Sequence, residues 1–243
     1  MNTPFLSIVI PAYNEESRLP RTLGQVFTFL EKQAYTNEVL VVENASADRT
    51  LEVAEGFTSN HENLRVLHEK QRGKGYAVQR GMLEARGQYR FICDADLSMP
   101  IEEVNNFLPP TLADFDLAIG SREAAGAFRY NEPAYRHWGG RAINFAIQAL
   151  ILPGLNDTQC GFKCFRAEIA NDLFPVQTIP GWAFDIEILY LARRRGYRIK
   201  EVPIDWYFDP DSKVNALRDA IHMLADIFHI RANALRGRYG HKS

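Results

Sequence analysis

The segment Phe91-Ile92-Cys93-Asp94-Ala95-Asp96 joins an apolar run to two carboxylates that are one residue apart. Residues i and i+2 of a strand project to the same face, so Asp94 and Asp96 converge if the extended geometry continues to the end of the run. Carboxylate oxygens suit Mg²⁺ or Mn²⁺, and a cation with few protein ligands completes its shell with substrate phosphates. We therefore predict that Asp94 and Asp96 bind a divalent metal in a nucleotide site. A simpler interpretation is that the two acids only end a strand and cap a helix beginning near Ile101.

Short β-rich runs alternate with longer amphipathic runs, which is the pattern of an α/β domain with a mostly parallel sheet. The predicted strands are Leu6 to Ile10, Glu38 to Val42, Leu64 to Leu67, Tyr89 to Cys93, Leu117 to Gly120 and Arg198 to Val202. The predicted helices are Arg18 to Lys32, Asp48 to Phe57, Tyr76 to Arg86, Tyr135 to Leu152 and Phe184 to Arg195. A chain of 243 residues with 46% hydrophobic content can bury one sizeable core, so we expect a single domain. In such sheets, ligands bind beyond the carboxyl ends of the strands.

Composition argues against several classes of protein. The net charge of -2 gives no overall attraction to nucleic acid. Cys93, Cys160 and Cys164 lack the spacing of a zinc site or a disulfide framework, which favours a reducing cytoplasmic setting. The segment Met1 to Ile10 does not resemble a signal peptide, and the apolar run Ala142 to Leu152 is too short to span a bilayer. We expect a cytoplasmic protein that is soluble or peripheral to a membrane.

Polar motifs follow the first and second predicted strands. In Pro11-Ala12-Tyr13-Asn14-Glu15-Glu16, the ring of Tyr13 offers a stacking face and Glu15 offers a hydrogen-bond partner for a base or ribose. In the segment 43–50, Glu43 can accept a hydrogen bond from a ring N–H. Each motif also fits a simpler role, because polar residues at such positions cap the helix that follows.

The segment Gly73-Lys74-Gly75 places a cation and exposed backbone N–H groups at the start of a predicted helix. Helix starts of this kind bind phosphate. The segment is not a P-loop, because the full glycine and Ser/Thr spacing is missing. We predict that Lys74 contacts a phosphate of a nucleotide.

The order of four motifs resembles glycosyltransferase family 2, whose members have the GT-A fold. These motifs are PAYNEE (11–16), VVENASADRT (41–50), GKGYAVQRGM (73–82) and DADLS (94–98). Three more make the chain similar to the dolichyl-phosphate (polyprenyl-phosphate) β-glucosyltransferases, with the dolichyl-phosphate mannosyltransferases as near relatives: IGSR (119–122), DTQCGFK (157–163) and WAFDIEILY (182–190). The resemblance covers roughly residues 6–208 and implies a Rossmann-like, mostly parallel sheet flanked by helices.

The resemblance implies a nucleotide-diphosphate sugar donor, a Mg²⁺ or Mn²⁺ ion on its diphosphate, and inversion at the anomeric carbon. Asp96 would hold the ion with Asp94 beside it. The implied donor contacts are Pro11, Tyr13, Glu15, Glu43, Lys74, Asp94 and Ala95. The family usually ends its second strand with two Asp residues, whereas this chain has Glu43-Asn44, so the base stays open. The motifs DTQCGFK and WAFDIE favour UDP-glucose, and DADLS is closer to the mannosyltransferases that use GDP-mannose.

A polyprenyl or dolichyl phosphate is the implied acceptor. Its second pKa is about 6, so at neutral pH its oxygen is already a nucleophile and needs no general base. The site instead needs cations that hold two anionic groups together. Arg122 and Arg136 match the arginines that bind the acceptor phosphate in the mannosyltransferases, and Lys163 is a third candidate. A serine common one turn after the second arginine is Gly140 here.

Other functions remain open at this point. A saccharide hydroxyl as acceptor would require a carboxylate base, for which Asp185 ranks first, Asp157 second and Glu187 last. A sugar-phosphate nucleotidyltransferase is disfavoured, because such enzymes need a glycine-rich loop after the first strand. The presence of Asp94, Asp96, Arg122 and Lys163 argues against a binding module without catalysis.

The C-terminal segment has a basic, amphipathic pattern. We expect residues 1–212 to form the catalytic domain and residues 213–243 to form an amphipathic helix with a basic tail. The predicted apolar side of this helix consists of Leu217, Ala220, Ile221, Leu224, Ile227 and Phe228. Arg231, Arg236 and Arg238 follow, so the helix either packs on its own domain or lies in a membrane interface on the cytoplasmic face.

Overall fold

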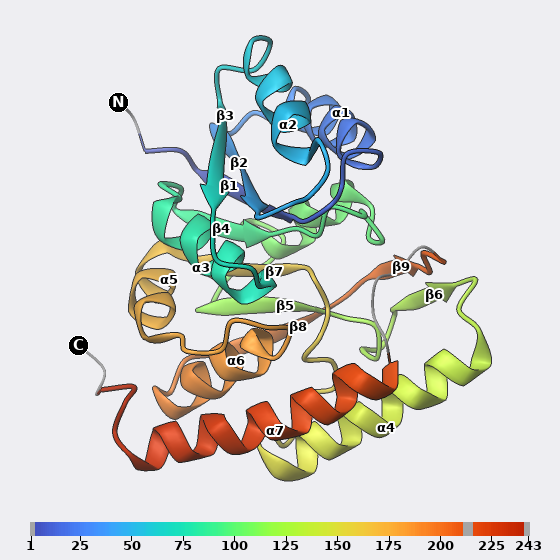
Figure 1. The fold of residues 1–243 in the computed structure, drawn as a ribbon, viewed down its shortest axis with the longest axis vertical. Coiled ribbons are helices and arrows are strands. Elements are labelled where there is room, and N and C mark those ends of the chain that lie inside the picture. The colour runs from blue at the N-terminus through green and yellow to red at the C-terminus, as the bar shows by residue number, and fades with distance from the viewer. Residues whose placement is uncertain (1–2, 211–215, 241–243) are drawn as a thin grey trace.

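A seven-stranded sheet forms the centre of the structure (Figure 1). The computed structural model describes residues 3–210 and 216–240, without the side chains of residues 135, 136 and 216–221. In spatial order the strands are β3 (Leu64–Glu69), β2 (Asn37–Asn44), β1 (Leu6–Ala12), β4 (Tyr89–Ile92), β7 (Lys163–Arg166), β5 (Leu117–Ser121) and β8 (Ile199–Pro203). Neighbouring strands pair in parallel except at β7, which is antiparallel to both β4 and β5. The predicted α/β fold with a mostly parallel sheet is confirmed.

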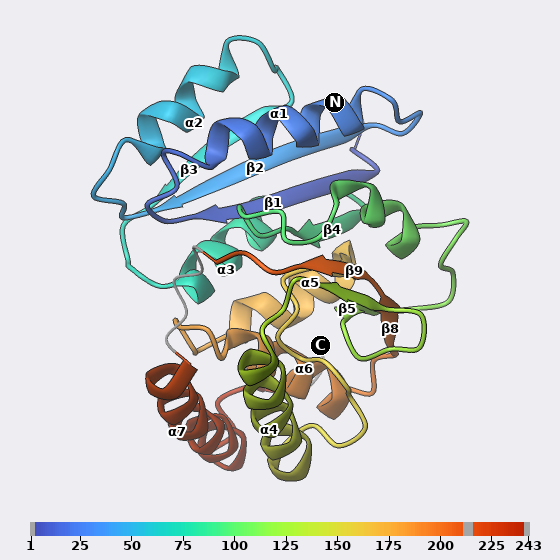
Figure 2. The same ribbon diagram turned by 90° about the vertical axis from the view of Figure 1, so that its right-hand side faces the viewer.

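Helices cover both faces of this sheet (Figure 2). The helices are α1 (Leu19–Leu30), α2 (Thr50–Thr58), α3 (Lys74–Glu84), α4 (Ala134–Leu150), α5 (Ala167–Leu173), α6 (Phe184–Arg194) and α7 (Ala216–Leu235), with 3-10 turns at η1 (Ile101–Phe107) and η2 (Phe174–Val176). Two short strands, β6 (Phe128–Tyr130) and β9 (Asp205–Tyr207), pair in parallel outside the main sheet. Alternation along β1 sends Val9 into the core under α3, α5 and α6, and sends Ile8 and Ile10 into the core under α1 and η1. Both faces are buried, as is usual for strands with parallel neighbours.

All six predicted strands and all five predicted helices are present, with ends that differ by a few residues. The predictions missed β7, α5 and the β6–β9 pair. The missed elements are short, and β7 has charged residues at both ends, so neither an apolar run nor a helical period marks them. The helix expected near Ile101 is the 3-10 turn η1.

Helix α7 lies beside α4 and contacts α6 (Figures 1 and 2). Met223, Ile227 and Ile230 on its inner side belong to the core. Along the predicted apolar side, Ile227 is buried whereas Leu224 and Phe228 are exposed, so this side packs on the domain only in part. The side chains of Leu217, Ala220 and Ile221 lie outside the described residues. Within the described ranges, no helix combines the length and apolar composition needed to cross a bilayer.

Gly81 allows α3 to approach the sheet closely. A Cβ atom at this position would lie 2.3 Å from Cγ1 of Val9 and 2.9 Å from Cγ2 of Val42. Both neighbours are fully buried in central strands, so neither can move aside without disturbing the core.

We expect Gly81→Ala to lower the free energy of unfolding by about 1–3 kcal/mol, because the added methyl group overpacks the core. The matched control is Gly56→Ala in α2, where a Cβ atom would have no neighbour within 4 Å. This control should gain about 0.5–1 kcal/mol from helix propensity. Urea unfolding of both variants measures the difference, and effects of the same sign would contradict this account of α3 packing.

Candidate functional site

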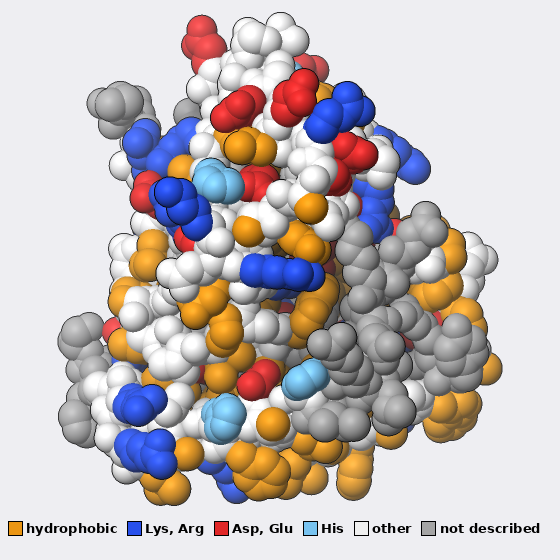
Figure 3. Space-filling view, viewed as in Figure 1, with side chains coloured by type: hydrophobic (Ala, Val, Ile, Leu, Met, Phe, Trp, Pro, Cys, Tyr) orange, Lys and Arg blue, Asp and Glu red, His pale blue; other side chains and the backbone are white. Residues whose placement is uncertain are grey.

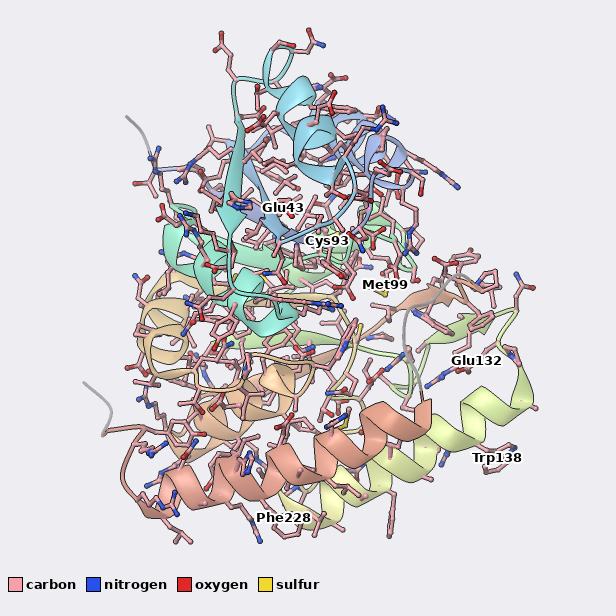
Figure 4. The ribbon with its side chains drawn as sticks, in the orientation of Figure 1. Glu43, Cys93, Met99, Glu132, Trp138 and Phe228 are labelled. Carbon is pink, nitrogen blue, oxygen red and sulfur yellow. The ribbon has the colours of Figure 1, made fainter. Side chains whose placement is uncertain are left out.

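A cavity of about 610 Å³ opens at the carboxyl ends of the strands. Its walls come from the loops after β1, β2, β4 and β5, from the start of α3, from α4 and from the segment that leads into α6. Figure 4 labels two lining residues, Met99 beside the sheet and Glu132 near the start of α4. The predicted residues that line it are Pro11, Tyr13, Glu15, Lys74, Asp94, Ala95, Asp96, Arg122, Asp157 and Asp185. Residues far apart in the sequence meet here because parallel strands end at one edge of the sheet.

Asp94 and Asp96 both face this cavity. Oδ1 of Asp94 lies 2.6 Å from Nζ of Lys74, and Oδ1 of Asp96 accepts a hydrogen bond of 3.0 Å from the backbone N–H of Ser98. Desolvation by the surrounding protein raises the pKa of Asp96, and the negative charge of Asp94 raises it further. The charge of Lys74 offsets only part of this upward shift, and a divalent cation bound between the two carboxylates would stabilise their ionised forms further.

Gly161 provides the space for the carboxylate of Asp94. A Cβ atom at position 161 would lie 2.1 Å from Oδ2 of Asp94, so any other residue would displace this carboxylate. The position of the Asp94 carboxylate therefore explains why the DTQCGFK motif has a glycine at residue 161.

Lys74 is the cation closest to the acidic pair in the described part of the cavity. Burial lowers its pKa, but the charges of Asp94 and Asp185 outweigh this effect, so the net shift is upward and the ammonium stays charged. Its Nζ also lies 4.7 Å from the ring centroid of Trp182, a cation–π contact. The predicted cation is thus in place to contact a phosphate group near Asp94.

The glycines around Lys74 have a different role from the one predicted. The N–H of Gly73 donates to Oδ1 of Asn44 at 2.8 Å, and the N–H of Gly75 donates to the carbonyl of Pro180 at 2.8 Å. Cβ atoms at these two glycines would each lie 2.4 Å from a carbonyl oxygen, of Pro180 and Ile179 respectively. The prediction that these N–H groups are exposed is wrong, because close backbone packing uses them.

Arg122 and Asp157 form a bidentate ion pair on the cavity wall. Nε of Arg122 lies 2.6 Å from Oδ2 of Asp157, and the second nitrogen donates to Oδ1 at 2.9 Å. Burial raises the pKa of Asp157, but the charge and hydrogen bonds of Arg122 outweigh it and hold the pKa below its ordinary value. The guanidinium also lies 5.4 Å from the ring centroid of Trp206. Asp157 therefore positions Arg122 and is a poor proton acceptor.

Lys163 and Asp185 form a second, deeper pair. The Lys163 side chain is buried in β7, and its Nζ lies 2.8 Å from Oδ1 of Asp185 and donates to the carbonyl of Cys160. Lys163 does not line the cavity, so the prediction that it holds an acceptor phosphate does not fit its position. Burial raises the pKa of Asp185, an effect that the charges of Lys163 and Lys74 partly offset. Of this pair, only Asp185 reaches the cavity wall.

At the other end of the cavity, the guanidinium of Arg72 lies 4.6 Å from the ring centroid of Tyr13. Glu15 forms an ion pair with Arg18, whose Nε lies 2.7 Å from Oε2 of Glu15.

Glu43 does not line the cavity, although it was predicted to contact the donor. Its carboxylate is buried away from the cavity, where Oε1 accepts the N–H of Ser46 at 2.5 Å and Oε2 contacts Nδ1 of His68.

Several lining residues were not predicted. They are Arg18, Asn44, Arg72, Arg129, Trp182 and Trp206. Trp182 opens the WAFDIEILY motif and Arg72 immediately precedes the Gly73-Lys74-Gly75 segment, so their sequence positions offered a signal. Arg129 belongs to none of the recognised motifs, and its ion pairs are with Glu132 and Glu123, three and six residues away. The predicted Arg136 lies in α4, but its side chain is outside the described residues.

Comparisons with known proteins agree with this architecture. The chain matches the family described as glycosyl transferase family 2 over residues 7–174. It is 35% identical to a dolichyl-phosphate beta-glucosyltransferase of Dictyostelium discoideum, over 98% of this chain and 77% of that protein. It is 33% identical to the Homo sapiens protein of the same name, over 98% of this chain and 78% of that protein.

Solved structures show the same fold at lower identity. The structure of glucosyl-3-phosphoglycerate synthase from Mycobacterium tuberculosis in complex with uridine diphosphate matches with a TM-score of 0.67 and 19% identity, over 99% of this chain and 82% of that one. A structure of that enzyme with Mn²⁺, uridine diphosphate and phosphoglyceric acid matches with a TM-score of 0.69 and 19% identity, over 99% and 80% of the two chains. The family match and the identities to curated relatives carry the assignment, and the chain belongs to glycosyltransferase family 2.

Proposed function

We propose that this protein is an inverting hexosyltransferase that moves glucose from UDP-glucose to a polyprenyl or dolichyl phosphate. The observation that carries this proposal is the state of the three predicted bases. Asp157 is held by Arg122, Asp185 is paired with Lys163, and Glu187 is fully buried in hydrogen bonds. A site arranged in this way suits an acceptor that is already ionised. The names of the curated relatives support glucose as the transferred sugar and dolichyl phosphate as the acceptor.

Asp94 and Asp96 fit a Mg²⁺ or Mn²⁺ ion. They are hard oxygen ligands on one cavity wall, and burial together with the charge of Asp94 raises the pKa of Asp96. Among the described residues no cluster of three or more potential metal ligands occurs, so the donor diphosphate would complete the shell. When bound, the ion neutralises charge that develops on the departing nucleoside diphosphate.

In the transfer step, an oxygen of the acceptor phosphate forms a bond to the anomeric carbon. The bond from that carbon to the donor diphosphate breaks, and its electron pair leaves with the nucleoside diphosphate. No proton has to be removed, because the acceptor oxygen is ionised. Arg122, oriented by Asp157, holds the acceptor phosphate against the repulsion of the donor, while Lys74 contacts the donor phosphates. Attack from the face opposite the leaving group inverts the configuration.

The lipid acceptor calls for contact with a membrane, and the outer face of α4 and α7 suits this role. This face, the α4–α7 face, carries exposed apolar side chains: Trp138, Phe145, Leu224, Phe228 and Leu235. In Figure 4 Trp138 and Phe228 point away from the sheet, and Figure 3 shows hydrophobic side chains along the same edge. Arg141, Arg231, Arg236 and Arg238 are exposed on or next to these helices. Basic amphipathic helices bind anionic membranes, so we place the protein peripherally on the cytoplasmic face.

Removal of one carboxylate of the acidic pair tests the donor site. We expect Asp96→Asn to reduce transfer from UDP-glucose by about 100-fold or more, because the diphosphate loses its counter-charge. The variant should also lose the additional thermal stabilisation that Mn²⁺ gives in the presence of UDP-glucose. The control is Asp114→Asn, which changes an exposed carboxylate. Its transfer rate and its stabilisation by Mn²⁺ should equal those of the unchanged protein. Full Mn²⁺-dependent stabilisation of Asp96→Asn would contradict the proposed metal site.

The pH dependence of the reaction separates an ionised acceptor from a carboxylate base. We expect kcat/KM to fall as the pH drops below about 6, because the acceptor phosphate then gains a proton. A phosphonate acceptor, which has a higher second pKa, should move this limb to higher pH, and Asp185→Asn should leave its position unchanged. The raised pKa of Asp185 would also give an acidic limb if this residue were a base. In that case Asp185→Asn would abolish the limb and the phosphonate would not shift it.

Vesicle binding tests the α4–α7 face. We expect the double variant Trp138→Ser with Phe145→Ser to bind vesicles of phosphatidylglycerol at least about 10-fold more weakly, because two large apolar side chains no longer enter the interface. The control is Leu83→Ser on α3, which removes an exposed apolar side chain from another part of the surface. Cosedimentation at two salt concentrations measures the affinity. Equal binding by both variants would show that the α4–α7 face is not the contact.

A further inference from the structure

Glu187 is a buried carboxylate that the proposed reaction does not use. It lies in α6 between the sheet and α7 (Figure 1), and its relative exposure is 0%. Its Oε2 accepts the backbone N–H groups of Thr178 and Ile179 at 2.9 Å and 2.8 Å. Its Oε1 accepts the hydroxyl groups of Thr178 and Tyr239 at 2.5 Å and 2.7 Å. Four donors thus compensate one buried charge, and the loss of a donor is costly in such a place.

The segment 177–182, here called the strap, connects Glu187 to the cavity. The carbonyl of Pro180 accepts the N–H of Gly75, and the side-chain amide of Gln177 donates to the carbonyl of Gly75 at 2.9 Å. The strap also carries Trp182, whose ring contacts the ammonium of Lys74. Since no space remains between the strap and Gly73 or Gly75, a shift of the strap must move Lys74 relative to Asp94.

The C-terminal segment reaches the same network from the other side. The hydroxyl of Tyr239 donates to Glu187, and Nδ2 of Asn233 donates to Oγ1 of Thr178 at 3.0 Å. The carbonyl of Tyr239 accepts a hydrogen bond of 2.8 Å from Arg195. Neither Tyr239 nor Asn233 is among the residues that line the cavity. A continuous set of contacts therefore runs from the end of α7 through Glu187 and the strap to Lys74.

We propose that Glu187 is a positioning residue for the donor site, and that Tyr239 acts through it to fix Lys74 beside Asp94. The identity of the ligand in this inference rests on the proposed function, whereas the link between Tyr239 and the Lys74 loop does not. Because α7 also carries half of the α4–α7 face, the same network joins that face to the donor site.

The test compares two tyrosines whose hydroxyl groups each donate a hydrogen bond to one side chain. Tyr239→Phe removes the bond to Glu187, and Tyr35→Phe removes a bond of 2.9 Å to Asn105 in η1, on the other face of the sheet. In the protein without ligand, we expect hydrogen exchange of the amides in residues 73–77 to become about 10-fold faster in Tyr239→Phe and to stay unchanged in Tyr35→Phe. The KM for UDP-glucose with Mn²⁺ should rise about 5- to 10-fold only in Tyr239→Phe, with a smaller change in kcat.

A second pair of variants separates positioning from general stability. Glu187→Gln keeps an oxygen for the two backbone N–H groups, and its amide can donate to the two hydroxyl groups, so it should retain most of the protection at residues 73–77. Glu187→Ala should lose this protection.

If Tyr239→Phe does not fold, Asn233→Ala provides the same exchange measurement, because it removes the hydrogen bond to Thr178. Equal exchange at 73–77 in both tyrosine variants would overturn the proposal. If the unchanged protein does not bind UDP-glucose with Mn²⁺, the proposed donor is wrong. The hydrogen exchange of residues 73–77 would then still test whether Tyr239 is coupled to the Lys74 loop.

Discussion

The repulsion between Asp94 and Asp96 is the constraint around which the cavity is organised. Two carboxylates at the end of β4 require nearby positive charge, and Lys74 supplies it from the first residue of α3 at 2.6 Å. Gly161 supplies the space for one of them. The position of Lys74 depends in turn on the strap, whose carbonyls pack against Gly73 and Gly75. The acidic pair at the end of β4 therefore depends on three other segments, the start of α3, Gly161 and the strap, and only the folded sheet brings these together.

Other charged groups on the cavity wall form ion pairs as well. Arg122 is bound by Asp157, Asp185 by the buried Lys163, and Arg129 by Glu123 and Glu132. Each pair fixes a long side chain that would otherwise sample many rotamers, so the site is preorganised before a ligand arrives. Such pairing also explains why phosphate chemistry suits this cavity better than proton abstraction. Asp185 also lies on the wall, where burial raises its pKa, but its carboxylate is held by Lys163.

The sequence predicted the fold well because the central strands are apolar on both faces and the helices are amphipathic. It failed at β7, where four residues with Lys163 and Arg166 at the ends give no periodic signal. Among the site residues, Asp94, Asp96 and Lys74 were recognisable because each is a charged group at the end of a strand or the start of a helix. Glu43 and Lys163 are also charged groups near the end or the start of a strand. In the structure, however, both side chains are buried and form ion pairs with His68 and Asp185.

The sequence by itself determined the class of fold, the family and the edge of the sheet at which the cavity opens, because periodicity and motif order are local properties. Which polar side chains face the cavity was decided only by the tertiary structure. A charge faces the cavity or the interior according to partners that lie far away in the chain, as Arg122 and Asp157 are 35 residues apart and Glu187 and Tyr239 are 52 apart. Burial stabilises such a charge only when those partners arrive with the right geometry, and this geometry exists only in the folded protein.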